Sequence, residues 1–165
     1  MKISVAIITR DAADELERCL ASASFADEIV VLDQDSADRT ADVCAAHGAN
    51  LYQTVFEGFG PTKQKAAELC RNRWVFSLDS DEEITPELRV AIEALPEEPA
   101  ESAFTVNRLS RFLGRWIRHC GWHPDHVVRL FDRHRAGFND KPVHESIETD
   151  GTVGRLGGLL HHYTY

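Results

Sequence analysis

Apolar runs and amphipathic stretches alternate along the first hundred residues. The apolar runs are short and rich in Val, Ile and Leu, which is typical of strands buried on both faces. They occupy residues 2–9, 28–32, 50–55 and 74–78. Between them, apolar side chains recur at helical spacing, and the expected helices occupy residues 12–24, 37–46, 61–69 and 86–95. This repeated strand–helix order predicts a parallel sheet with helices on both faces.

Three of the expected helices carry a start signal of their own. Ser36 is placed to cap the second helix, because a serine oxygen can accept from the first free backbone N–H groups. Pro61 suits the first turn of the third helix. Thr85 followed by Pro86 predicts an N-cap and a first-turn proline for the fourth.

The alternation of strands and helices ends after residue 102. Short strands are expected at residues 103–109, 127–131, 143–147 and 153–160. Residues 112–125 are rich in Trp, Gly, His and Arg and are predicted to form a functional loop or short helix. No linker separates the two parts. The sequence therefore predicts one domain over residues 1–165, with a mixed, mainly parallel α/β sheet flanked by helices, a first half to residue 103 and a second half from residue 104.

The charge of the chain is uneven. The formal net charge is −9, from 18 basic and 27 acidic side chains, so a global positive field for nucleic acid is excluded. Residues 104–135 nevertheless hold seven arginines against the two acids Asp125 and Asp132. Such a stretch suits the phosphates of a substrate or an anionic membrane surface, and a solvated arginine face is the equally weighted alternative.

The cysteines and the N-terminus predict a cytoplasmic location. The four cysteines stand far apart and form no CxxC pair, which favours reduced thiols. No run of 18 apolar residues predicts a bilayer span, and the first apolar run is short, strand-like and without a small-residue cleavage site. Peripheral contact with the inner face of the cytoplasmic membrane is a further expectation from the basic stretch.

Acidic clusters follow two of the predicted strands. Asp33, Asp35 and Asp38 follow the second strand, and Asp79 and Asp81 follow the fourth. Ligands of open α/β sheets bind outside the carboxyl ends of the strands, where such carboxylates can hold Mg²⁺ or Mn²⁺ or accept from a ribose or a base. Helix capping is the alternative role for these acids.

The same segments resemble family 2 glycosyltransferases of the GT-A fold. The resemblance rests on ITRD at 8–11, EIVVLD at 28–33, SADRT at 36–40 and SLDSDE at 77–82, the last matching the family's DxD motif. The stretches FLGRWIRH at 112–119, GWHPD at 121–125 and PVHES at 142–146 resemble the lipopolysaccharide core β-1,4-glucosyltransferases more narrowly. The resemblance covers nearly the whole chain and implies a GT-A sheet.

The resemblance implies inverting transfer of a hexose from a nucleotide sugar to a hydroxyl. The implied donor is a UDP-hexose, with glucose from UDP-glucose suggested by the subfamily. The implied acceptor is a glycan or glycolipid of the cell envelope, such as the lipopolysaccharide core. A divalent metal, Mg²⁺ or Mn²⁺, would stabilise the leaving diphosphate.

The resemblance also assigns roles to residues. On the donor side it places Thr9 and Asp11 near the nucleotide, Asp33 at the nucleobase and Lys63 at the diphosphate. For the metal it offers Asp81, with Asp79 sharing the ion or accepting from the ribose, and His144 as a third ligand.

Two carboxylates, Asp125 and Glu145, are candidates for the base that deprotonates the acceptor hydroxyl, with a slight preference for Asp125. Trp116 and Trp122 offer flat faces for sugar stacking, with core packing as the equal alternative.

The sequence differs from the family pattern at two places, and two other functions remain as alternatives. The family's Asn-Glu after the first strand is Asp11-Ala12 here, and the chain ends where the subfamily continues. One alternative is a haloacid dehalogenase-type phosphatase with Asp33 as nucleophile. The other is a truncated module that binds a nucleotide sugar without transferring it.

Overall fold

The computed structural model describes residues 1–164. Its four helices are α1 (Ala13–Ser22), α2 (Thr40–Ala46), α3 (Phe59–Leu69) and α4 (Pro86–Glu93). The strands of the first half are β1 (Ile3–Thr9), β2 (Glu28–Asp33), β3 (Asn50–Gln53), β4 (Trp74–Asp79) and β5 (Glu82–Ile84). Those of the second half are β6 (Ala103–Phe112), β7 (Arg115–Trp116), β8 (Asp125–Asp132), β9 (Ala136–Phe138), β10 (Ile147–Thr149) and β11 (Val153–Tyr163).

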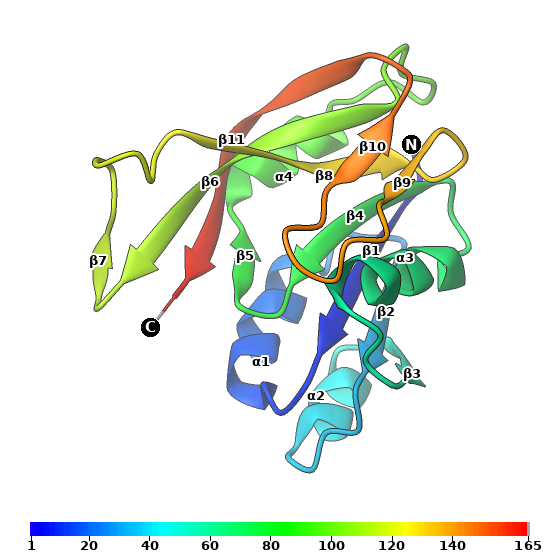
Figure 1. The fold of residues 1–165 in the computed structure, drawn as a ribbon, viewed down its shortest axis with the longest axis vertical. Helices are drawn as coiled ribbons and strands as arrows, with labels where there is room; N and C mark the ends of the chain where they lie inside the picture. The colour runs from blue at the N-terminus through cyan, green and yellow to red at the C-terminus, as the bar shows by residue number, and fades with distance from the viewer. Residues whose placement is uncertain (165) are drawn as a thin grey trace.

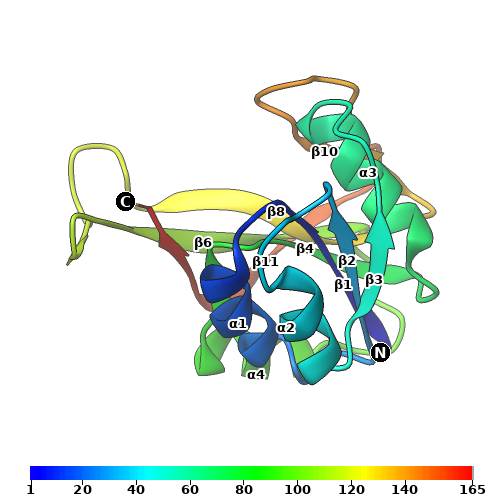
Figure 2. The same cartoon turned by 90° about the horizontal axis from the view of Figure 1, so that it is seen from below.

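One mixed sheet runs through the molecule in the order β3-β2-β1-β4-β8-β6-β11-β5, with β7 paired to β6 (Figure 1). The pairs from β3 to β4 are parallel, and β8 joins both β4 and β6 in antiparallel register. Figure 2 shows α1, α2 and α4 on one face, and α3 with β9 and β10 on the other. The predicted mixed, mainly parallel α/β sheet with helices on both faces is confirmed.

Burial on both faces explains the unbroken apolar runs of the central strands. In β1, Val5 and Ile7 are fully buried in the core shared with α1 and α4, whereas Ile8 packs in the core beneath α3. A side chain lost from either set would leave a cavity in one of two separate cores. No helix in residues 1–164 has the length and apolar character that crossing a bilayer requires.

Several local expectations were wrong. Ser36 does not cap α2, because this helix begins at Thr40. The Ser36 hydroxyl donates to Asp33 instead. Residues 143–147 form no strand of their own, because only Ile147 enters β10. The short strands β5, β7, β9 and β10 have two or three residues each, too few for a periodic pattern to show. The Thr85 cap of α4 is confirmed, since its hydroxyl accepts from the Leu88 N–H.

Gly158 allows β11 to pass close to α4. The register of β11 against β6 shifts between Arg155 and Leu159, and Gly158 has a φ of +84° in this irregular segment. A Cβ on Gly158 would lie 2.3 Å from the backbone nitrogen of Leu88. The adjacent Gly157 is exposed, and a Cβ there would meet nothing within 4 Å.

We predict that Gly158→Ala lowers the free energy of unfolding by about 2 to 4 kcal/mol, because it combines backbone strain with a clash. Gly157→Ala is the matched control and should change the value by less than about 0.5 kcal/mol. Urea denaturation followed by circular dichroism measures both. Equal effects of the two substitutions would contradict this account of the β11 irregularity.

Candidate functional site

The ends of β1 and β2 form one side of the site. Thr9 and Asp33 are register partners at the last position of these parallel strands, and both are buried. The Thr9 hydroxyl oxygen is buried without a hydrogen-bond partner among residues 1–164. Asp33 accepts from the Ser36 hydroxyl and from Gln53 Nε2 at 3.0 Å. This arrangement leaves a polar, partly unsatisfied edge at the place where α/β sheets bind ligands.

Asp11 joins this edge from the loop after β1. It has a φ of +45°, its N–H donates to Ser36 Oγ at 2.8 Å, and its carboxylate accepts from the Ala37 N–H at 2.7 Å. The loops after β1 and β2 are therefore tied together. The structure thus brings Thr9, Asp11 and Asp33 together, as the donor-side prediction requires.

Asp79, at the end of β4, is held between two cations. Its Oδ1 lies 2.8 Å from Lys63 Nζ on α3, and its Oδ2 lies 2.9 Å from Arg129 Nη2 on β8. Lys63 also contacts Glu145 at 2.7 Å, and Arg129 also contacts Glu82 at 2.6 Å. With each oxygen engaged by a cation, Asp79 is poorly placed to bind a metal directly.

These contacts belong to a longer row of alternating charges. Beyond Glu82, Arg108 Nη1 lies 3.7 Å away, and Arg108 Nη2 contacts Asp125 at 2.8 Å. We call the seven side chains the ion-pair row. In spatial order they are Glu145, Lys63, Asp79, Arg129, Glu82, Arg108 and Asp125. The row joins the two candidate base carboxylates at its two ends.

Burial sets the electrostatics of the row at its centre. Burial alone would raise the pKa of Asp79, but the charges of Arg129 and Lys63 hold that pKa well below its usual range. Burial raises the pKa of Glu82, and Arg129 opposes this only in part. The two carboxylates raise the pKa of Arg129 above its ordinary value despite its burial. Arg129 is thus a permanent cation that keeps Asp79 ionised.

A β-bulge directs Arg129 into the row. Between the pairs Phe104–Leu130 and Thr105–Val128, β8 contains one residue more than β6, and this residue is Arg129. Bulges insert an unpaired residue and change the direction of its side chain, often beside functional sites. Sequence patterns carry no signal for this position, so the row was not predicted.

Asp81 lies just beyond Asp79, in the turn before β5. Its Oδ2 is 3.3 Å from His162 Nε2 on β11, and its carbonyl accepts from the Tyr163 N–H at 2.9 Å. The other ring nitrogen of His162 lies 3.1 Å from Ser110 Oγ. A carboxylate and an imidazole nitrogen facing each other, with the ring held at its second nitrogen, suit a divalent cation.

The third predicted metal ligand is not part of this group. His144 is exposed, has a φ of +56° and lies in the loop whose next residue, Glu145, contacts Lys63. Within the described residues, no three His, Cys, Asp or Glu side chains gather into a metal-binding cluster. The sequence missed His162, because its proximity to Asp81 depends on how β11 pairs with β5.

The two base candidates differ in their surroundings. Asp125 receives Arg108 Nε and Nη2 on the same oxygen, Oδ2, and its side chain is 34% exposed. Glu145 contacts Lys63 through Oε1 and is 16% exposed. Asp125 is therefore oriented by Arg108, and its side chain is more exposed than that of Glu145.

Residues 112–125, predicted as a loop or short helix, form a loop that contains the two-residue strand β7 and no helix. β7 pairs with the end of β6, and the segment to β8 projects past the helices (Figure 2). Trp122 is 46% exposed and lies 6.1 Å from the Phe112 ring, whereas Trp116 packs at 4.2 Å from the His161 ring. Trp122 thus offers an open face, and Trp116 is part of an aromatic stack.

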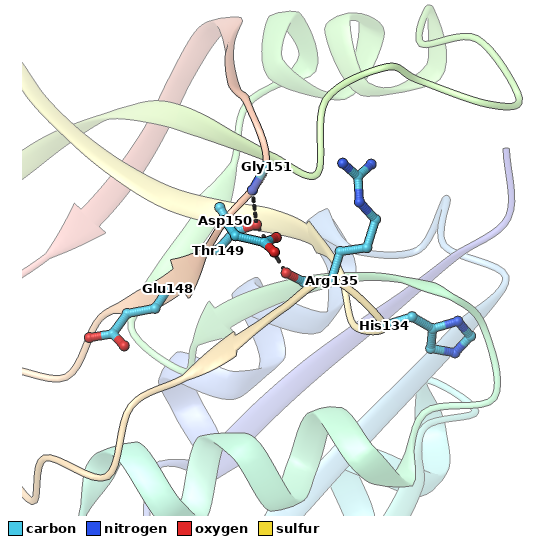
Figure 3. A pocket seen from close by; sticks show the side chains of 6 residues that line it. All are labelled: His134, Arg135, Glu148, Thr149, Asp150 and Gly151. Carbon is cyan, nitrogen blue, oxygen red and sulfur yellow. Dashed lines mark hydrogen bonds between the residues drawn. The ribbon is translucent and has the colours of Figure 1, made fainter.

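A shallow depression of about 800 Å³ lies elsewhere (Figure 3). It is lined by His134, Arg135, Glu148, Thr149, Asp150 and Gly151. Thr149 Oγ1 donates to the Arg135 carbonyl and accepts from the Gly151 N–H, so local hydrogen bonds shape this surface. The depression lies just after the last residue of β8, Asp132, which pairs with the first residue of β4, Trp74. Asp79 is at the other end of β4, so the depression and the carboxyl edge are on opposite sides of the sheet's length. We therefore place the site at the carboxyl edge.

The strand order and the carboxylates at the ends of β2 and β4 define an α/β protein of the GT-A class. The chain belongs to Glycosyl transferase family 2, whose match covers residues 4–159. This membership decides against the phosphatase alternative. Asp33 also fits that role poorly, because both of its oxygens already accept hydrogen bonds.

Two curated relatives illustrate the family. The chain is 31% identical to the lipopolysaccharide core biosynthesis glycosyltransferase LpsC of Rhizobium meliloti, over 98% of this chain and 63% of the relative. It is 27% identical to an uncharacterized glycosyltransferase of Rickettsia typhi, over 99% of this chain and 60% of the relative. The chain thus spans less than two thirds of these relatives.

Two solved structures share the fold. TarS 1-349 from S. aureus in complex with UDP-GlcNAc superposes with a TM-score of 0.73 at 17% identity, covering all of this chain and 59% of that TarS chain. Glucosyl-3-phosphoglycerate synthase from Mycobacterium tuberculosis, with Mn²⁺, UDP and glucosyl-3-phosphoglycerate, gives a TM-score of 0.57 at 18% identity. That match covers 81% of this chain and 57% of the synthase.

We predict that Arg129→Met lowers the free energy of unfolding by about 3 to 5 kcal/mol, because it leaves Asp79 and Glu82 buried without their shared cation. Arg39→Met is the control, since the Arg39–Asp14 pair is exposed and such pairs contribute little. Urea denaturation compares the two variants. A loss for Arg129→Met no larger than that of the control would show that the row contributes little to stability.

Proposed function

We propose that this chain transfers a hexose from a UDP-sugar to a hydroxyl of a glycan or glycolipid, with inversion at the anomeric carbon. The observation that carries the proposal is the proximity of Asp81 and His162 beside the ion-pair row, in a family 2 glycosyltransferase chain. The donor-side residues lie at the ends of β1 and β2, and the candidate base lies on β8.

In this proposal the nucleotide binds at the joined loops after β1 and β2. The unpartnered Thr9 hydroxyl offers a hydrogen bond to the nucleotide, and Asp33 accepts from an N–H of the uracil. Asp11 orders the loop that covers the base. Solved relatives of the same fold carry UDP and UDP-GlcNAc, which supports a uridine nucleotide. Glucose as the transferred sugar follows from the subfamily resemblance.

A divalent cation, Mg²⁺ or Mn²⁺, fits Asp81 and His162 better than the set predicted from the sequence. Oxygen and imidazole ligands suit Mn²⁺, and a site with two protein ligands leaves positions for diphosphate oxygens and water. Such an ion would neutralise the charge that develops on the departing diphosphate. Lys63, paired with Asp79 and Glu145, is placed to add positive charge from α3.

Asp125 is the proposed base. Its second oxygen takes the acceptor proton while the acceptor oxygen bonds to the anomeric carbon and the bond from that carbon to the UDP oxygen breaks. Arg108 fixes the other oxygen and so holds the carboxylate in place. Glu145 remains the second candidate, and its pairing with Lys63 favours a donor-side role.

The acceptor is proposed to be a lipopolysaccharide core or related cell-envelope glycan, reached from the cytoplasm at the inner face of the membrane. The 31% identity to LpsC supports this acceptor class. Nucleotide-sugar binding without transfer is the second candidate function, and the measurements below distinguish the two.

We expect UDP-sugars to raise the melting temperature of the chain more than GDP-, CDP- or ADP-sugars, and Mn²⁺ to increase this shift. Asp81→Asn and His162→Gln should each remove the Mn²⁺-dependent part, and Asp33→Ala should weaken selectivity for UDP. Asp140→Asn, on the exposed loop after β9, is the control. A Mn²⁺-dependent shift that persists in both Asp81→Asn and His162→Gln would refute the proposed metal site. A UDP-dependent shift without transfer to a core oligosaccharide would instead favour nucleotide-sugar binding without transfer.

For the base, Asp125→Asn should lower kcat for sugar transfer by about a hundredfold or more, since an amide cannot take the proton. Glu145→Gln should have a smaller effect on kcat and a larger one on donor binding, because Lys63 loses a partner. Calorimetric titration with the UDP-sugar confirms that each variant still binds donor. If Asp125→Asn keeps kcat within tenfold of the wild-type value while Glu145→Gln does not, Glu145 is the base and Asp125 is not.

A further inference from the structure

The arginines of the basic stretch divide into groups once their contacts are known. Arg108 and Arg129 form ion pairs with carboxylates of the ion-pair row, and Arg133 donates to the Glu68 carbonyl at 3.2 Å. Arg135 lines the shallow depression near β10, and Arg115 and Arg118 are exposed. Arg111 differs from all of these, because its guanidinium lies against aromatic rings.

A cluster of aromatic side chains and two arginines forms where β6, β7 and β11 end. The Arg111 guanidinium carbon lies 5.8 Å from the Trp116 ring centre and 5.9 Å from that of Tyr163. Arg18 reaches the same Tyr163 ring from α1, at 3.5 Å. His161 packs on Trp116 at 4.2 Å. We call these five side chains the arginine–aromatic cluster.

The two guanidinium groups of this cluster have no carboxylate partner within the part of the chain that the structure describes. Among residues 1–164, no carboxylate lies within salt-bridge distance of Arg18 or Arg111, and the Nε of each is buried without a hydrogen-bond partner. The neighbouring acid, Glu83, accepts from the Tyr163 hydroxyl and faces His161 at 3.7 Å. Two cations held on one ring with unused donors make a site that favours an added anion.

The position of the cluster points to the acceptor rather than to the nucleotide. Tyr163 follows His162 on β11 and its N–H donates to the Asp81 carbonyl, so the cluster lies at the same strand end as the proposed metal ligands, with its side chains on the alternate face of the strand. Arg111 lies on the same strand, β6, as Arg108, and the guanidinium of Arg108 contacts Asp125. Figure 1 shows this end of β6, β7 and β11 beyond β5, away from the ends of β1 and β2.

We propose that the arginine–aromatic cluster binds a phosphate group of the acceptor glycan. This inference rests on the proposed transfer function. Arg18 and Arg111 supply the unused N–H donors, and arginine binds phosphate and carboxylate through paired N–H groups. The acceptor is thereby selected for its negative charge.

The test compares transfer from the UDP-sugar to a lipopolysaccharide core oligosaccharide with transfer to the same oligosaccharide after its phosphates are removed with hydrofluoric acid. The wild-type chain should show a KM about ten- to a hundredfold lower for the phosphorylated acceptor, as expected for charge-assisted hydrogen bonds. Arg111→Gln and Arg18→Gln should each reduce this ratio, and the double variant should bring it close to one. Arg115→Gln removes an exposed arginine from β7 and should keep the wild-type ratio.

Three outcomes would overturn the proposal. The first is an equal KM for both acceptors in the wild-type chain. The second is a loss of the ratio in Arg115→Gln as large as in Arg111→Gln, which would indicate general attraction. The third is a raised KM for the UDP-sugar in Arg111→Gln, which would assign the cluster to the donor diphosphate.

A second measurement separates failure of this proposal from failure of the proposed function. If the wild-type chain transfers to neither acceptor, binding of glucose 6-phosphate and of glucose is compared by calorimetry. Tighter binding of glucose 6-phosphate that is lost in Arg111→Gln supports the anion site even without transfer. Equal binding of the two sugars overturns it.

Discussion

The buried guanidinium of Arg129, shared by Asp79 and Glu82, is the interaction on which the rest of the site depends. Removing three charged groups from water is costly, and only close pairing with good hydrogen-bond geometry offsets the cost. The pairing joins the end of β4, the start of β5 and the bulge of β8, which are far apart in the sequence. It therefore connects the parallel half of the sheet to the antiparallel half at the carboxyl edge.

This constraint separates the roles of two carboxylates that stand only two residues apart. Asp79 is enclosed by Arg129 and Lys63 and acts within the ion-pair row. Asp81 lies outside the row and faces His162. From the sequence, the DxD motif offers Asp81 to the metal and leaves Asp79 either to share the ion or to accept from the ribose. In the structure the first acid contacts two cations, and the second faces His162.

Local patterns predicted the parts of the fold that local forces determine. The apolar runs of β1, β2 and β4 reflect burial on both faces, and the acids after β2 and β4 follow from where these strands stop. The partners of Asp79 and Asp81 could not be predicted in this way. Arg129 follows Asp79 by 50 residues and meets it only through a bulge, and His162 depends on the register of β11 against β5. Pairing between distant strands leaves no periodic signal in either one.

Long-range pairing also decides which charges of the chain are available to a ligand. A value of −9 describes an acidic chain with a basic stretch, but it does not tell which arginines are already neutralised. The ion-pair row uses Arg108 and Arg129 to satisfy buried or half-buried acids, so these two contribute little attraction to a ligand. Arg18, which belongs to the acidic half, joins Arg111 at an aromatic ring without a carboxylate partner in residues 1–164. The capacity to attract an anion is therefore set by which cations the fold leaves unpaired, rather than by the net charge.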